Sequence, residues 1–291
     1  MQSLFSSGVI FALLSLLFAG LLDVMYKRYS RIARSRGMFL MGMGITFCTL
    51  QLFSTWVFDE TLSVSDATLT YGLAAGALVT VSNILLIESF THLDVSLGST
   101  IYRLNTIGVV ALSWLFLAES LAVLKLMGIA FGVLAALLLY QHHKQQTTHR
   151  DLALFFWLAV LASVFRAGFG VLSKAGISAD GNASSMMVIA ATCWIVGGFT
   201  YALVRETDRQ INLTIIGYSV VSGSLVFMVV NTLYAALARG DASVVIPIAN
   251  LSFVVALLIS VLLKMEQLTM RKVSALAFAI VAIGLLSQQV A

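Results

Sequence analysis

Four ionisable side chains lie inside long apolar stretches of this sequence, where a charge is costly and usually marks a functional site. They are Asp23, Glu88, Arg103 and Arg166. A guanidinium presents a planar fork of donors that suits a carboxylate or a phosphate, and a buried carboxylate can balance an amine or carry a proton. The four residues therefore predict a site for a small polar molecule; the alternative is two buried ion pairs that only hold segments together.

The two arginines are the strongest candidates for binding an anion, because neither has a carboxylate one helical turn away in its own segment. Asp23 has Lys27 four residues on, so a local ion pair is the simpler interpretation there. Glu88 has His92 at the same spacing. A carboxylate near an imidazole can titrate near neutral pH, so we consider Glu88, His92 and Asp23 as candidates for proton coupling. A structural hydrogen bond at a helix end is the alternative for Glu88.

Uncharged polar residues extend the predicted site, since amides and phenols can hydrogen-bond a substrate and a phenol ring can stack on one. The amides fall at similar depths of corresponding segments, and hydrogen bonding between helices is their alternative role. The additional candidates are Asn83, Asn231, Asn105, Asn250, Tyr102 and Tyr234.

The composition excludes an ordinary soluble protein. Of 291 residues, 60% are hydrophobic, and the 17 basic and 13 acidic residues amount to about a tenth of the chain. A soluble domain carries about a quarter of charged residues, because it must cover its core with polar surface. The net charge of +4 is small and scattered, so a nucleic-acid partner is not expected and the lipid bilayer is.

Ten apolar windows are each long enough to cross a bilayer as a helix, which takes about 20 residues. The runs are continuous rather than alternating, which favours helices over barrel strands. We predict an all-α integral membrane protein with spans at about 5–26, 38–57, 68–90, 96–118, 121–140, 152–174, 184–204, 212–238, 242–264 and 269–288. No connection is long enough for a soluble catalytic domain, and no intramembrane catalytic set is visible, so an enzyme is not expected.

A constant shift of 147 residues pairs many polar positions, which indicates an internal duplication. Each half, 1–145 and 146–291, then holds five spans. Because five is odd, the second half enters the membrane from the opposite side, and the halves are inverted repeats around a central cavity, an arrangement used by secondary transporters. The matched pairs include Lys27 and Lys174, Asp94 and Asp241, Ser96 and Ser243, Glu119 and Glu266, and Lys125 and Lys272.

The repeat resembles the EamA-type repeat of the drug/metabolite transporter superfamily. Residues 93–139 and 240–286 each have a polar entry, an apolar span that ends in Glu119 or Glu266, a short turn, and a span rich in small residues. Many EamA repeats also carry a proline midway along the fourth helix. In this chain the corresponding positions are about Thr106 and Phe253, and its one proline is Pro247.

The resemblance implies ten helices and a cavity lined by the first, third and fourth helices of each repeat, with the fifth helices at the periphery. Gly128 and Gly132 fit close packing of the two fifth helices against each other, so we expect a monomer; a dimer interface is the alternative. The matched pairs Lys27 and Lys174, and Glu119 and Glu266, are interpreted as structural. The mates of Arg103 and Arg166 are Asn250 and Ala19; these two charges are therefore interpreted as specialised after duplication.

Neither a cofactor nor a metal is expected. His142, His143 and His149 cluster in one connection, but no acidic or cysteine ligand is placed to complete a site. Cys48 and Cys193 are interpreted as small buried hydrophobic residues.

The basic residues predict an orientation. Twelve of the 17 lie in the connections after the first, third, fifth, seventh and ninth spans, and three lie on the other side. The positive-inside rule then places both termini outside. The family resemblance favours both termini inside, so the two indications disagree.

Together these observations predict a secondary transporter, and we expect an exporter of a small polar, zwitterionic or anionic metabolite in a bacterial inner membrane. No phosphate-binding loop for ATP is present, so protons or a counter-substrate would drive it. The alternatives are an anion exchanger of the sugar-phosphate type and, from another class, a membrane scaffold or receptor without transport.

Overall fold

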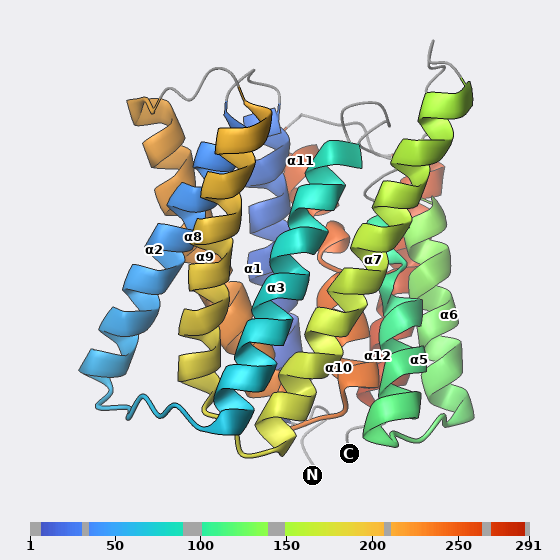
Figure 1. Ribbon diagram of the computed structural model, residues 1–291. Coiled ribbons are helices and arrows are strands. Elements are labelled where there is room, and N and C mark those ends of the chain that lie inside the picture. Colours follow the sequence, from blue (N-terminus) through green and yellow to red (C-terminus); the bar gives the residue numbers. More distant parts are fainter. Residues whose placement is uncertain are drawn as a thin grey trace.

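The computed structural model describes residues 7–30, 35–89, 101–138, 149–206, 211–263 and 269–288. Over these residues the protein is all-helical (Figure 1). The helices are α1 (Ser7–Ser30), α2 (Arg36–Val57), α3 (Asp66–Ser89), α5 (Asn105–Leu117), α6 (Val123–Leu138), α7 (His149–Ser178), α8 (Ala183–Arg205), α9 (Leu213–Leu237), α10 (Ala242–Asn250), α11 (Phe253–Leu262) and α12 (Met270–Ser287).

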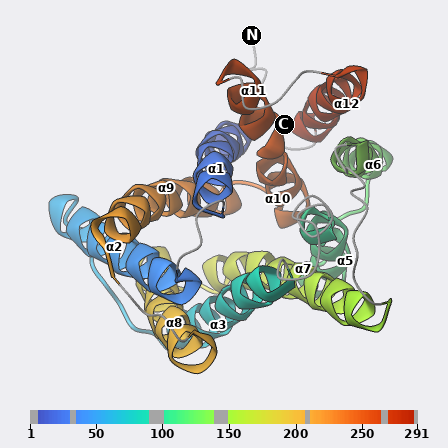
Figure 2. The ribbon, with the colours of Figure 1, turned by 90° about the horizontal axis from the view of Figure 1, so that it is seen from above.

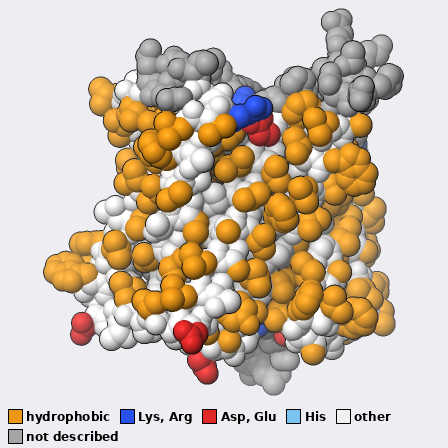
Figure 3. Space-filling view, in the orientation of Figure 1, with side chains coloured by type: hydrophobic (Ala, Val, Ile, Leu, Met, Phe, Trp, Pro, Cys, Tyr) orange, Lys and Arg blue, Asp and Glu red, His pale blue; other side chains and the backbone are white. Residues whose placement is uncertain are grey.

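The ten predicted spans are confirmed. Eight described helical segments are long and apolar enough to cross a membrane, α10 and α11 counting as one of them. The segments Ile101–Leu117 and Val123–Leu138 are shorter apolar helices at the fourth and fifth predicted positions. Large apolar side chains such as Phe116 and Leu262 are 70% and 80% exposed. On the face shown in Figure 3, hydrophobic side chains are spread over the middle, and the charged side chains lie near the two ends. Such a surface is stable against lipid rather than water.

Polar side chains start several helices by accepting the first free backbone N–H groups. Ser35 accepts from the N–H of Met38, Asn182 from Ser185, and Asn212 from Ile215. Each provides the acceptor that a helix cannot supply to its own first turn. These caps explain why α2, α8 and α9 begin where they do.

Eight spans form a closed ring when each is followed to the helices it packs against. The order is α1, α9, α2, α8, α3, α7, α5, α10 and back to α1 (Figure 2). Every one of these contacts joins a helix of the first half of the chain to a helix of the second. The two halves are therefore interleaved and share one core.

The helix contacts occur in pairs that the 147-residue shift relates to each other. The packing of α1 on α9 corresponds to α7 on α3, and α2 on α9 corresponds to α8 on α3. The peripheral helices α6 and α12 pack on each other, where a Cβ on Gly128 would lie 2.8 Å from Leu286 Cγ. This confirms the predicted packing of the fifth helices within one chain. The inverted repeat and its boundary near residue 145 remain predictions that this pairing supports.

Glycine allows a close backbone-to-backbone approach in the ring, between α2 and α8. A Cβ built on Gly198 would lie 2.6 Å from the backbone nitrogen of Met41 and 3.0 Å from the carbonyl oxygen of Gly37. Backbone atoms cannot move aside as a side chain can, so a methyl group there must separate the helices.

We therefore expect Gly198→Ala to lower the free energy of unfolding by about 1–3 kcal/mol, the usual cost of overpacking. Gly217→Ala is the matched control, because nothing lies within 4 Å of a Cβ at that position. Thermal unfolding of the purified protein in detergent measures both. Equal melting temperatures for the two variants would contradict this account of the crossing.

Candidate functional site

The fourth helix of each half is interrupted at the same repeat position. The breaks lie at Leu104 and Leu251, which are 147 residues apart. Each leucine N–H bonds to the carbonyl three residues earlier instead of four. Three residues later, the N–H groups of Ile107 and Val254 bond to the two leucine carbonyls, at 3.0 and 2.9 Å. The carbonyl before each leucine therefore loses its usual helical donor.

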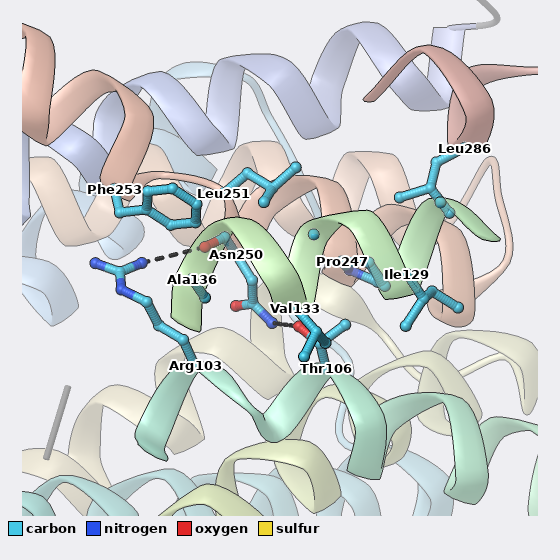
Figure 4. A pocket seen from close by; sticks show the side chains of 12 residues that line it. Arg103, Thr106, Ile129, Val133, Ala136, Pro247, Asn250, Leu251, Phe253 and Leu286 are labelled. Carbon is cyan, nitrogen blue, oxygen red and sulfur yellow. Dashed lines mark hydrogen bonds between the residues drawn. The ribbon is translucent and has the colours of Figure 1, made fainter. Parts of the chain in front are cut away.

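Arg103 supplies the missing donor at the second break (Figure 4). Its Nη1 donates to the carbonyl oxygen of Asn250 at 3.1 Å and to Ser252 Oγ at 3.1 Å. Its Nη2 donates to Asp23 Oδ2 at 2.7 Å, and Ser252 Oγ also donates to this oxygen, at 3.1 Å. The guanidinium lies over the Phe253 ring, 5.3 Å from its centre. The structure thus joins Asp23 and Arg103 in a single network around the break.

Asn250 makes the reverse connection to the first break. Its Nδ2 donates to Asn105 Oδ1 at 2.5 Å and to Thr106 Oγ1 at 3.0 Å. Side chains from each broken helix therefore satisfy polar groups of the other, and three of the predicted amide and guanidinium residues meet here.

Small residues bring the first helix of one half against the broken helix of the other. A Cβ on Gly20 would lie 2.8 Å from the carbonyl oxygen of Ser252 and 2.5 Å from Val255 Cβ. At the corresponding contact the small residue is on the other helix, since a Cβ on Gly108 would lie 2.9 Å from Ala167 Cβ. Gly20 thereby places Asp23, one turn later on α1, beside the break.

Arg166 lies near this network but, among the residues described, is in contact with an aromatic ring instead of hydrogen-bond acceptors. Its guanidinium is 5.1 Å from the centre of the Phe169 ring, and no ion pair or hydrogen bond joins it to any other described residue. Tyr26 lies within electrostatic reach of Asp23, Tyr102 and Arg166. These residues come from α1, α7 and the turn of helix before α5, so Arg166 belongs to the same central region.

Asn83 contributes a second incompletely bonded donor. Tyr102 Oη donates to Asn83 Oδ1 at 3.5 Å, which is a long contact. The Asn83 Nδ2 atom is buried and has no hydrogen-bond partner among the described residues. Its neighbour Ser82 donates to the carbonyl oxygen of Ala162, one turn before Arg166 on α7. A buried amide donor without a partner is destabilising unless a ligand or water bonds it.

The structure places other predicted site residues away from this cluster. Glu88 accepts from Arg205 Nε at 2.9 Å at the end of α8, where Arg205 is 62% exposed. Asn231 donates to Gln51 Oε1 at 2.8 Å, and Tyr234 to Ser173 Oγ at 3.1 Å. These are contacts between helices of the ring.

Some predicted residues lie outside what the structure describes. His92 and Glu266 are not among the described residues, and the side chain of Lys27 is not described although the residue is on α1. Among the described residues, no three His, Cys, Asp or Glu side chains gather as a metal site requires. Of the clustered histidines, His142 and His143 fall outside those residues, and the side chain of His149 is not described.

Glu119 caps the helix that carries the second break. Its Oε1 accepts the N–H of Ala242 at 2.7 Å, and its Oε2 accepts the N–H of Ser243 at 2.9 Å and the Ser243 hydroxyl. Lys125 then bonds Ser243 Oγ at 2.9 Å and Asp241 at 3.0 Å. A carboxylate at a helix N-terminus is favoured by both the free N–H groups and the helix dipole.

Lys174 stabilises the turn between α9 and α10. Its Nζ donates to the carbonyl oxygens of Leu237 and Gly240, at 2.6 and 2.9 Å. These contacts agree with the structural interpretation of Glu119 and Lys174. The sequence already contained the signal for the Lys125 cluster, because its members are repeat-matched; for Tyr26 and Ser252 it contained none.

A narrow cavity lies beside the breaks, between α5, α6, α10 and α12 (Figure 4). Arg103, Thr106 and Asn250 provide its polar side, and Gly132, Val133 and other small or apolar residues provide the rest. Its volume is about 10 Å³, which is room for roughly one water molecule. This conformation therefore holds the breaks tightly packed on the side of the fifth helices.

Comparisons with known proteins agree with this architecture. Residues 6–141 match the model of the EamA-like transporter family. A solved structure titled "Crystal structure of protein" superposes with a TM-score of 0.83 at 12% identity, over 98% of this chain and 99% of that one. At this identity the likeness concerns the fold alone. No curated protein sequence matches significantly.

The Asp23–Arg103 contact is expected to be energetically coupled. Hydrogen bonds to charged groups contribute about 1.5–3 kcal/mol when partly buried, and these side chains are 32% and 21% exposed. A double-mutant cycle with Asp23→Asn and Arg103→Gln should give a coupling energy of roughly 1–3 kcal/mol in detergent unfolding. The exposed Glu88–Arg205 pair is the control and should couple less. If the free-energy changes of the Asp23 and Arg103 single variants add up to that of the double variant, the contact contributes nothing to stability.

Glu119→Gln should destabilise the start of α10. The amide keeps the shape but loses the charge and replaces one acceptor by a donor facing a backbone N–H, at a cost of about 1–2 kcal/mol. Thermal unfolding measures it, with Glu60→Gln as the exposed control. An unchanged melting temperature would show that Glu119 does not contribute to the stability of the fold.

Proposed function

We propose that this chain, whose residues 6–141 match the EamA-like transporter family, is a member of that family and carries a small polar metabolite across the membrane as a secondary transporter. The family consists of membrane transporters of small molecules, and that general function holds for this chain. The finer function rests on the interior of the bundle, developed below.

The observation that carries the proposal is the pair of facing helix breaks with charges between them. Irregular backbone inside a membrane protein is tolerated where protein or a water-filled site satisfies it, and discontinuous helices build the substrate sites of many transporters. Here both breaks fall at repeat-matched leucines, and Arg103, Asp23 and Asn250 connect them. A site at the meeting of two equivalent halves can be opened to either side by exchanging their conformations.

Arg103, Arg166 and Asp23 are therefore proposed as the central substrate-site residues, with Asn83, Asn105, Asn250 and Tyr102 beside them. Glu88, Asn231 and Tyr234 are retained as secondary candidates, because they lie in contacts between ring helices that must rearrange during alternating access. Of the two carboxylates among the proton-coupling candidates, Asp23 is the better one, because it lies against the break. Glu88 lies beside an exposed arginine.

Direction, drive and setting are part of the same proposal. We propose an exporter in a bacterial inner membrane, driven by protons or a counter-substrate, that functions as a monomer. The α6–α12 packing supports a monomer, because it covers within one chain the small residues that could otherwise pair two chains. For orientation we follow the basic residues, which place both termini outside.

Two other functions remain to be separated from this one. An exchanger of sugar-phosphate type would need cations for a phosphate, and the two central arginines provide the reason to test it. A scaffold or receptor without transport has no need of two equivalent halves with matched breaks, and this disfavours it.

The test is efflux from proteoliposomes loaded with a defined mixture of carboxylates, amino acids and sugar phosphates, with each component followed by mass spectrometry. We expect at least one component to leave faster than from protein-free liposomes. Arg103→Ala and Arg166→Ala should slow that efflux by roughly tenfold or more, since each removes a charge-assisted contact. Arg271→Ala, at an exposed position of α12, should not.

The two levels of the proposal fail separately. If no component leaves faster than from protein-free liposomes, transport of these classes is wrong. If efflux occurs and both central variants carry it at the wild-type rate, the site assignment is wrong while transport stands.

A further inference from the structure

We propose that the substrate is a monovalent anion and that Asp23 sets this valence by neutralising Arg103, which leaves Arg166 as the cation that receives it. This inference rests on the proposed function and names the substrate class of the same site. It follows from the partners of the three charges and from the repeat positions they occupy.

The charge of Arg103 is already used. Nη2 is 2.7 Å from Asp23, Nη1 bonds two oxygens at the break, and one face of the guanidinium covers the Phe253 ring. Asp23 therefore balances the positive charge that an incoming anion would otherwise meet at Arg103. Arg103 and Asp23 therefore contribute no net charge to the site.

Arg166 is available in a way that Arg103 is not. Among the described residues its guanidinium has the Phe169 ring as a neighbour but no carboxylate or hydrogen-bond acceptor. The buried Nδ2 of Asn83, also without a partner, offers a second donor in the same central region. Within the described part of the chain these are two donors without acceptors and one positive charge without a counter-ion, which suit a ligand with a single negative group such as a carboxylate.

Other charge types fit less well. A zwitterion brings an ammonium that needs a carboxylate, and the central carboxylate, Asp23, is held by Arg103 and Ser252. A dianion such as a phosphate monoester needs two free cations, and one of the two central arginines is neutralised. With a bound monoanion the three central charges and the ligand sum to zero, which is the least costly outcome in a membrane.

The break at Leu104 shows that a break in this scaffold can form beside neutral side chains. The repeat mates of Asp23, Arg103 and Arg166 are Gly170, Asn250 and Ala19. The break at Leu104 forms with the neutral Asn250, Asn105 and Thr106 bonding beside it. The three charges are thus an addition to a scaffold that folds with neutral groups at the equivalent positions, which argues for a role in substrate selection.

The experiment is a binding series with probes of equal carbon number but different charge. Purified protein in detergent is titrated with butyrate, butyramide, 2-aminobutyrate, butylamine and succinate, and stabilisation is read from thermal unfolding, because a ligand of the folded state raises its apparent stability. We expect butyrate to bind wild type more tightly than the other four. In Arg166→Gln this preference should fall by roughly tenfold, while Arg166→Lys should retain part of it and the control Arg271→Gln, at an exposed position of α12, all of it.

Asp23 is tested through valence rather than affinity. Asp23→Asn frees Arg103, so the affinity for succinate relative to butyrate should rise by about tenfold. The double variant Asp23→Asn with Arg103→Gln removes that extra charge and should restore the wild-type preference for butyrate. A residue needed only for folding would not change valence selectivity and restore it in this way.

The proposal would be overturned if the wild type showed no preference for butyrate, or if no probe stabilised it. Tighter binding of 2-aminobutyrate or succinate than of butyrate would also overturn it, as would an unchanged preference for butyrate in Arg166→Gln. An unchanged succinate-to-butyrate ratio in Asp23→Asn would remove Asp23 from the selection of valence. These readouts are independent of flux. Butyrate binding without efflux would contradict the proposed transport alone, whereas efflux of a zwitterion would contradict the charge rule alone.

Discussion

The interior of this protein depends on one backbone carbonyl that a broken helix leaves without its usual donor. In a bilayer each unbonded peptide group is strongly destabilising, so the break at Leu251 can exist only where the fold supplies a partner. Arg103 donates to the Asn250 carbonyl, its charge is balanced by Asp23, and Gly20 lets α1 lie close enough to present that carboxylate. One backbone requirement therefore fixes a side chain, its counter-ion and a helix crossing.

The interleaving of the two halves makes this dependence mutual. The ring alternates so that helices of one half pack mainly on helices of the other. Glu119 of the first half caps α10 in the second, and Glu206 of the second half accepts the N–H groups of Arg36 and Gly37 at the start of α2 in the first. The start of α2, the start of α10 and the break at Leu251 are thus each satisfied by a side chain of the other half. A conformational change in one half must therefore be accompanied by a change in the other, which is the coupling that alternating access requires.

The two halves have similar helix packing but different charges, and these two features serve different purposes. Matched leucines, small residues and helix crossings give the two halves similar shapes and hence similar conformational choices. The charges at Asp23, Arg103 and Arg166 have neutral repeat mates, so they make the shared interior polar on one side without disturbing the pairing of the halves. Symmetric packing with asymmetric chemistry suits a protein that must move reversibly around a ligand with its own polarity.

The sequence by itself determined the ten spans, because continuous apolar length decides where a helix can cross a bilayer. It also indicated the duplication, through polar residues that match at one constant shift, and it identified Asp23, Arg103 and Arg166 by their cost inside apolar runs. It could not choose partners. Asp23 had Lys27 one turn away, yet the structure joins it to Arg103, 80 residues on; Glu88 pairs with Arg205, 117 residues on. Which residues meet depends on which helices become neighbours and how each is rotated, and in an interleaved bundle both are decided by packing between segments far apart in the chain.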